Sequence, residues 1–335
     1  MPALIEDNML AWKGEKPWHG LGFEVPALAT GEEMLKISKL DWPVQRRSIA
    51  MRTADGKSTL TAQLKGFKAI VRGDNDYVFQ VATDKYFPVQ NAEIVSFFRE
   101  YCEAGSATME TVGGLKGGAI IWALAKLNHG TTVKIGGVDE LKGYLLLATS
   151  HDGSVRTIGK ATQIRVVCAN TLMCAFGEHS KQEFKMKHTR KWTPEVAAEA
   201  KVVMGMAVEQ VIQANELAEQ FSKIKIDLKG QTEFVKRLLA KPVLVPVLNE
   251  PEAKDGLSRT GKAIMESINT SPGADLPTAK WTVWGTINGI TAYVDHQQGR
   301  VQDNRVHGAL FATGTANIKV QAVNLAAEMA GIKVR

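Results

Sequence analysis

Short β-prone runs that alternate with turn signals are the feature that most constrains how this chain folds. Between Val44 and Ala82 the runs VQRRSIAMR, GFKAIVR and YVFQVA are separated by Ala54-Asp55-Gly56 and by Gly73-Asp74-Asn75-Asp76. β-branched and aromatic residues favour extended backbone, whereas Gly, Asp and Asn favour tight turns. Runs this short, with turns this close, predict antiparallel strands joined by hairpins.

A second group of β-prone runs follows a predicted helix over Asn91–Ala104, where apolar residues recur at helical spacing. This group predicts an antiparallel meander with strands over Ala107–Val112, Gly118–Leu127, Leu141–Thr149 and Ser154–Ile158. Directly after the meander, apolar residues recur every three or four positions. That spacing predicts an amphipathic helix over Gln163–Phe176, laid on the sheet.

The last third of the chain is predicted to be largely helical. Thr193 before Pro194 marks a helix start, because Thr can cap free amides and Pro is tolerated in the first turn, and the apolar pattern continues to about Phe221. Further helices are predicted over Thr232–Ala240, Arg259–Ile268, Trp281–Tyr293 and Thr315–Ala330. The polar stretches Asn249–Gly256 and Asn269–Ala279 are interpreted as loops or mobile segments.

Together these patterns predict an α+β fold. We expect a twisted antiparallel β-sheet with a β-β-β-α core over residues 1–192, which would bind nucleic acid. A mainly helical C-terminal region with mobile loops would follow over residues 193–335. The length of 335 residues is ample for either one large domain or two ordinary ones.

Composition excludes several classes of protein. Hydrophobic residues make up 44% of the chain and charged residues 23%, which argues against a disordered, collagen-like or coiled-coil chain. The longest apolar runs are far shorter than the ~18 residues of a membrane span. Three cysteines without a CxxC pair make a disulfide framework or a standard zinc site unexpected. We therefore expect a cytoplasmic protein with no membrane partner.

Positive charge is concentrated in one segment. The net charge is +6, and residues 156–191 carry all of that excess, with Glu178 and Glu183 as their only acidic residues. The basic residues of this segment are Arg156, Lys160, Arg165, Lys181, Lys185, Lys187, Arg190 and Lys191. Such a local field attracts polyanions, and each cation that meets a phosphate can release a condensed counterion. Nucleic acid is the expected partner class, and the alternative is a solvated basic face without a ligand.

Aromatic residues near these cations could stack on single-stranded bases. The candidates are Tyr77, Tyr86, Phe87, Phe184 and Trp192. Trp192 directly follows Arg190-Lys191, which places a possible base-stacking ring beside possible phosphate contacts. A Trp just before a helix start can equally staple that helix to the core, and this alternative stays open.

The sequence shows no catalytic centre, and we expect neither an enzyme nor a bound cofactor or metal. The stretch Gly256–Ala263 resembles a phosphate-binding P-loop, but Ala263 stands where a Ser or Thr hydroxyl would hold Mg²⁺. The alternative interpretation is a loop that leads into a helix. The seven histidines show no metal-ligand spacing such as HExxH.

Several motifs together resemble a known family. They are Trp18–Gly22, Tyr86–Asn91, the run Ile164–Leu172 followed by Lys187-His188-Thr189, and Trp284-Gly285 through Tyr293–His296. This set, spread over nearly the whole chain, resembles the phage/plasmid-like protein family that is built on a domain of unknown function. The resemblance implies a bacterial host cell as the setting and says little about biochemistry.

A second likeness concerns the order of elements. Three antiparallel strands followed by a helix, with basic residues on both sides of the junction, are similar to the β-β-β-α core of the single-strand annealing recombinases. Those proteins form rings or filaments and hold single-stranded DNA in a positively charged groove. The likeness is one of fold, and one fold can serve many functions.

The leading hypothesis is an ATP-independent protein that binds single-stranded DNA and promotes annealing or homologous recombination. It would work as a ring- or filament-forming homo-oligomer, with a phage nuclease or a host single-strand-binding protein as possible further partners. The residues expected to form the groove are Arg156, Lys160, Arg165, Lys185, Lys187, His188, Arg190, Lys191 and Trp192. The alternative is a non-enzymatic phage or plasmid assembly protein whose basic segment docks an acidic partner.

Overall fold

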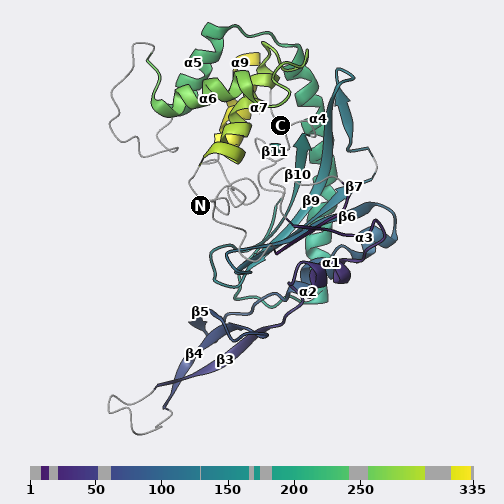
Figure 1. Ribbon diagram of the computed structural model, residues 1–335, viewed down its shortest axis with the longest axis vertical. Helices are drawn as coiled ribbons and strands as arrows, with labels where there is room; N and C mark the ends of the chain where they lie inside the picture. The colour runs from purple at the N-terminus through teal and green to yellow at the C-terminus, as the bar shows by residue number, and fades with distance from the viewer. Residues whose placement is uncertain are drawn as a thin grey trace.

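The computed structural model describes residues 9–14, 22–51, 62–128, 130–165, 170–173, 183–240, 256–298 and 318–332. Within these residues the chain is an elongated α+β molecule with a large sheet at its centre (Figure 1). A three-stranded sheet projects from one end, and the C-terminal helices lie at the other (Figure 1). The mixed fold with antiparallel sheets and a helical C-terminal half confirms the predicted fold class.

The projecting sheet, which we call the arm, consists of β3 (Val44–Met51), β4 (Ala62–Arg72) and β5 (Val78–Thr83). Its strands pair antiparallel in the order β3-β4-β5, as the turn-punctuated runs predict. Near the base of the arm Ile70 and Val71 are buried, whereas further along the sheet most side chains are exposed.

The large sheet has nine strands among the described residues, in the order β11-β10-β9-β7-β6-β1-β2, with β12 paired to β10 and β8 to β9. Apart from the parallel pair β1–β2, its ladders are antiparallel. The strands are β1 (Leu10–Trp12), β2 (Phe23–Glu24), β6 (Ala107–Leu115), β7 (Ile120–Leu127), β8 (Val133–Ile135), β9 (Asp139–Ser150), β10 (Thr157–Arg165), β11 (Asn170–Met173) and β12 (Phe184–Met186). Strands β7 and β9 are buried along almost their whole length and form the centre of the core.

The predicted helix over Gln163–Phe176 is wrong. β10 continues to Arg165, and β11 returns along it, pairing Arg165 with Asn170 and Thr162 with Met173. The segment is rich in β-branched residues, which pack well on a pleated sheet and lose rotamer freedom in a helix. The three- and four-residue spacing of apolar positions therefore gave the wrong period.

Helices α1 (Gly31–Ile37), α2 (Asn91–Ser96), α3 (Arg99–Glu103) and α4 (Pro194–Lys223) pack on the sheet, with α4 lying along β10. α4 begins where predicted, because the Thr193 side chain accepts a hydrogen bond from the Val196 amide. On β10 Gln163 donates to Asn215 Oδ1 of α4 (2.6 Å). Thus α4 covers the sheet in place of the predicted helix. The predicted helix over Asn91–Ala104 is two short helices, α2 and α3.

The C-terminal region consists of α5 (Leu228–Leu239), α6 (Arg259–Thr270), α7 (Val283–Ala292), the π-helical turn η3 (Tyr293–Gln297) and α9 (Ile318–Ala330). Their positions agree with the predicted helices, although α5 begins earlier than expected. The P-loop-like stretch is a loop that leads into α6, with the Ser258 hydroxyl capping the Gly261 amide (3.1 Å). Residues 249–255 of the predicted mobile segment lie outside the described residues.

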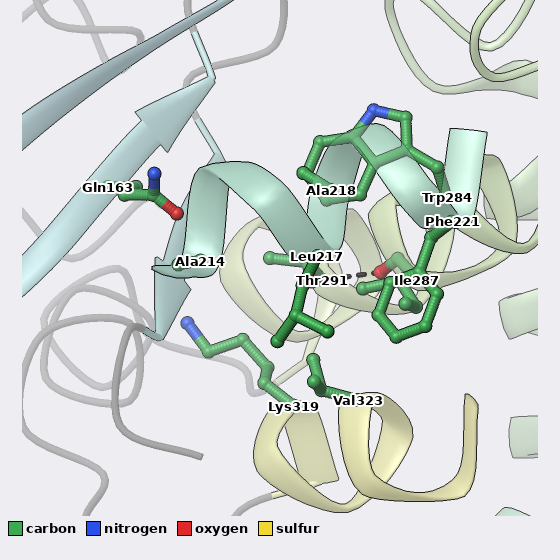
Figure 2. Close-up of a pocket in the computed structure, with 10 residues that line it drawn as sticks. All are labelled: Gln163, Ala214, Leu217, Ala218, Phe221, Trp284, Ile287, Thr291, Lys319 and Val323. Atoms are coloured by element: carbon green, nitrogen blue, oxygen red, sulfur yellow. Dashed lines mark hydrogen bonds between the residues drawn. The ribbon is translucent and has the colours of Figure 1, made fainter. Parts of the chain in front are cut away.

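A narrow cavity of about 20 Å³ lies where α4, α7 and α9 meet β10. Its lining is mostly apolar, and Lys319 of α9 and Gln163 of β10 are its most polar side chains (Figure 2). Lys319 Nζ lies 2.8 Å from Asp295 Oδ1, and both side chains are almost fully buried. The cavity has room for about one water molecule and is part of the packing between the sheet and the C-terminal helices.

Candidate nucleic-acid interface

The short edge strand β12 brings part of the predicted basic segment against the start of β10. Thr157 pairs with Met186 and Ile158 with Lys185 in an antiparallel register. Arg156 and Lys187, which flank the first of these pairs, therefore lie at the same end of the ladder. Both are exposed. The backbone thus gathers two cations that are far apart in the sequence.

Phe87 joins this edge to the base of the arm. Its amide donates to the His188 carbonyl oxygen (2.6 Å), which ties the segment before α2 to the segment after β12. The Arg46 guanidinium of β3 and the Lys191 ammonium lie over the Phe87 ring, 4.8 and 5.0 Å from its centroid. The negative face of an aromatic ring attracts cations, so Phe87 holds two positive groups close to its ring.

Two other predicted cations have acidic partners. Lys185 Nζ lies 2.7 Å from Glu183 Oε2, and Arg190 Nη2 lies 2.7 Å from Glu199 Oε2. Each ion pair cancels charge that a phosphate would otherwise meet. In the part of the chain that the structure describes, Arg156, Lys187 and Lys191 have no such acidic partner.

We call the surface formed by Arg46, Phe87, Arg156, Lys187 and Lys191 the Phe87 patch. A short chain of contacts connects its members. His188 Nε2 donates to the Val155 carbonyl oxygen, beside Arg156 (2.9 Å), and the His188 carbonyl accepts from Phe87. Arg46 also donates to the Asp84 carbonyl oxygen. The patch therefore has a defined backbone scaffold and a net positive charge.

Several predicted groove residues are not on this surface. Lys160 is 2% exposed and His188 is 7% exposed, so neither reaches a phosphate on the outside of the molecule. Trp192 packs against the rings of Phe97 and Phe184, each at 6.1 Å, which supports the core-packing alternative. The structure places Arg165 at the end of β10, and its side chain lies outside what the structure describes.

His188 also lacks the positive charge that the prediction needs. Burial lowers its pKa, with smaller opposing effects from its hydrogen bonds to Val155 and Phe87. Its ring stacks on Tyr86 at 4.7 Å, and Tyr86 in turn donates to the Ser150 carbonyl oxygen (2.8 Å). His188, neutral and stacked on Tyr86, therefore holds the neighbouring residues of the patch in place and does not itself contact a phosphate.

Two of the five candidate stacking rings remain accessible. Tyr77, directly before β5, is 58% exposed, and Phe87 is partly exposed beside its two cations. Tyr86 and Phe184 are buried, and Trp192 is partly buried with its ring packed on Phe97 and Phe184. Of the two accessible rings, Phe87 is the one that lies among cations.

Arg46 is the member of the patch that sequence reasoning did not single out. It lies on β3, far from the basic segment in sequence, in a strand that carries two arginines and no acidic residue. Its spacing gives no signal, because Arg46 follows the buried Val44 by two residues and therefore shares that residue's face of β3. No spacing rule connects it to Lys191.

The structure adds two findings about other kinds of site. In the described ranges there is no group of three or more His, Cys, Asp or Glu side chains that could hold a metal ion. None of the helices described here is both long and apolar enough to cross a membrane.

The fold and the patch define an α+β protein with a basic surface where a sheet edge meets a projecting arm. Comparison with known families then places it more narrowly. The model of DUF932, a domain of unknown function, matches residues 78–325, and the chain belongs to that family. No curated protein and no solved structure matches the chain.

Proposed function

We propose that this protein binds single-stranded DNA and promotes ATP-independent strand annealing or recombination for a phage or plasmid, in the cytoplasm of its bacterial host. The observation that supports this most directly is the Phe87 patch. Its cations Arg156, Lys187 and Lys191 have no acidic partner among the described residues. Cations that are already gathered and not neutralised are suited to a sugar-phosphate backbone.

The order of elements also supports the proposal. The antiparallel strands β7, β9 and β10 are followed, after β12, by the long helix α4, which packs on β10. Strands and then a covering helix are the order of the β-β-β-α core of annealing recombinases, with α4 in the place of the helix predicted earlier in the chain. As a likeness of fold alone, it adds to the argument from charge and does not replace it.

Binding through this patch depends on salt. If Arg46, Arg156, Lys187 and Lys191 each neutralise one phosphate, the slope of log affinity against log salt on a single strand is about −3. One subunit therefore binds weakly at physiological salt. Several subunits on one strand bind more tightly, because each further contact is intramolecular.

The test uses the charge-reversal pair Lys187→Glu/Lys191→Glu and a labelled oligonucleotide of a few tens of nucleotides. Fluorescence anisotropy across a salt series is expected to show wild-type binding that weakens steeply with salt. The variant is expected to bind about tenfold more weakly or worse, with a slope shallower by about 1.4, because two phosphate contacts are lost.

The matched control is Lys36→Glu/Lys134→Glu, which changes net charge equally at exposed lysines outside the patch. Binding by this control close to the wild type supports a local site. Equal weakening of both variants would show general attraction of a basic protein for DNA, against the proposal. If the wild type does not bind DNA, the alternative function, docking of an acidic protein on the same cations, takes its place.

A further inference from the structure

One face of the arm carries exposed apolar side chains. β4 presents Phe67 and Ala69 on this face, with the buried Val71 at its base. The register places Val81 and Arg47 opposite Ala69, and Val78 opposite Val71. Phe67 is 42% exposed, Val78 50% and Val81 55%. Adjacent exposed apolar side chains on a sheet face are typical of a surface that contacts another protein.

The turn between β4 and β5 adds acidic groups beside this face. Asp74 and Asp76 lie in the turn, and Tyr77, which follows them, is 58% exposed. Hydrogen bonding to Arg72 lowers the pKa of Asp74 and keeps it ionised. The turn therefore presents an exposed aromatic ring next to two carboxylates. Asp74 forms an ion pair with Arg72, and Asp76 forms one with Arg47.

The opposite end of the molecule carries an open groove of about 740 Å³. It lies where the segment between α4 and α5 pairs with the segment before α7, through the Ile226 amide and the Trp281 carbonyl (3.1 Å). Leu228 and Trp281 line it and are 56% and 43% exposed. Pro277 and the lysines Lys225 and Lys280 line it as well.

Charge in the groove is mainly positive. Its one acidic lining residue, Asp227, caps α5 by accepting a hydrogen bond from the Gly230 amide (2.7 Å). Lys225 and Lys280 have no acidic partner in the part of the chain described here. The groove therefore combines apolar side chains with two available cations.

Trp281 has a strained backbone. Its φ of 55° lies in the left-handed region, which costs an L-residue of this size on the order of 1–3 kcal/mol. Its ring is nevertheless partly exposed, so burial within this chain offsets little of the free-energy cost of that strain. A large aromatic side chain held in this way is better explained by a partner that covers it.

We propose that the arm of one copy of this chain docks in the groove of the next copy. Apolar residues of the arm would meet Leu228 and Trp281. The carboxylates of Asp74 and Asp76, which stay exposed beside their arginine partners, would meet Lys225 and Lys280. The two surfaces lie at opposite ends of the molecule and cannot meet within one chain (Figure 1). Such a head-to-tail contact generates rings or filaments, and it does not depend on nucleic-acid binding.

The test measures the mass of the full chain by sedimentation velocity over a range of concentrations. Wild type is expected to form assemblies larger than a dimer. Val81→Lys on the arm and Leu228→Lys in the groove are each expected to be monomeric, because each places a like charge or an unpaired ammonium in the contact. Both side chains are more than half exposed, so both variants keep the fold, which circular dichroism checks.

Mixing the two variants gives the decisive measurement. One intact arm and one intact groove remain between them, so an equal mixture is expected to form a dimer and nothing larger. The matched control Val202→Lys, at a residue 67% exposed on α4, is expected to assemble like the wild type. Binding of a short oligonucleotide by Val81→Lys is measured in a separate experiment. A failure of the assembly proposal can therefore be distinguished from a failure of the DNA-binding proposal.

Several outcomes would overturn the proposal. If the wild type sediments as a monomer at all concentrations, copies of the chain do not dock and the proposal is wrong. Assembly by Leu228→Lys alone, with Val81→Lys monomeric, would show that arms pair with arms. A mixture that stays monomeric, or Val202→Lys that also fails to assemble, would show that the two surfaces do not recognise each other.

Discussion

Lys319 and Asp295 form an ion pair inside the C-terminal region, with side chains only 2% and 1% exposed. Figure 2 shows Lys319 among mostly apolar neighbours from α4, α7 and α9. Removing one partner of such a pair takes a close counter-charge away from a buried ion, which costs far more than losing a pair at the surface. The pair therefore fixes η3 against α9.

Asp295→Asn keeps the shape of the side chain and removes its charge. We expect it to lower the free energy of unfolding by about 3–5 kcal/mol. Glu199→Gln, which breaks the exposed pair with Arg190, is the control and is expected to cost about 1 kcal/mol or less. Urea unfolding monitored by circular dichroism measures both, and equal losses would contradict the assigned difference.

His151 gives folding a pH dependence. It is fully buried, and this burial lowers its pKa to about 3, with the nearby His188 adding to the effect. Because the folded pKa is below the unfolded value of about 6.5, the unfolded chain binds the proton more readily. The stability is therefore complete above about pH 6.5 and is lost as the pH falls toward 3.

Between pH 7.5 and pH 5, His151 alone is expected to remove about 2 kcal/mol of stability. His151→Gln keeps a polar side chain that can face Asn91, and it should show a shallower loss over the same range. Urea titrations at several pH values give the slope for each protein. Identical slopes would mean that other groups cause the dependence.

At this scale the sequence predicts which residues carry charge but not which of them reach the surface. Lys160 and Arg156 are both basic residues of the same segment, yet Lys160 lies inside β10 and Arg156 precedes the strand. A count of basic residues in the sequence does not distinguish Lys160 from Arg156. Their difference depends on what packs on each part of the sheet, which spacing alone does not contain.

The close approach of α6 and α7 depends on Gly289 of α7. A Cβ atom at Gly289 would lie 2.3 Å from the Ile268 Cα of α6, so the two helices touch backbone to backbone. Side chains cannot move aside to relieve such a contact. The crossing of α6 and α7 therefore requires glycine at this position.

Gly289→Ala is expected to destabilise the protein by about 3 kcal/mol, the upper part of the usual range for overpacking. Gly205→Ala on α4, where a Cβ would meet nothing within 4 Å, is the control. It is expected to add about 0.5–1 kcal/mol, because Ala favours helix over Gly. Thermal and urea unfolding of both variants test the pair, and a loss at Gly205 would contradict the reasoning.

Most elements of this fold could be predicted from local patterns, and the one clear error is instructive. Thr193 and Pro194 locate the start of α4, and the turn residues locate the arm. The apolar residues around Ile164 fit both the helical and the strand period. The segment forms strands because the end of β10 pairs with β11. Pairing between strands is a long-range fact that a local window does not contain.

For the whole molecule, assembly and binding are expected to act together. If copies join through arm and groove, each assembly presents many Phe87 patches to one strand, and avidity rises without any new contact. Val81→Lys should then bind a short oligonucleotide like the wild type and a long one about 100-fold more weakly. Anisotropy with both lengths measures this, and equal loss on both would place Val81 in the binding site itself.

The hydrogen bond between the Phe87 amide and the His188 carbonyl has a consequence for protein synthesis. A ribosome adds about 5–20 residues per second, so Phe87 waits roughly 5–20 s before Lys191 is made. During that interval the arm can already form from its own hairpins, while the Phe87 amide still lacks the His188 carbonyl as its partner. A nascent chain of this protein therefore offers an apolar surface to chaperones well before it can offer a finished site to any ligand.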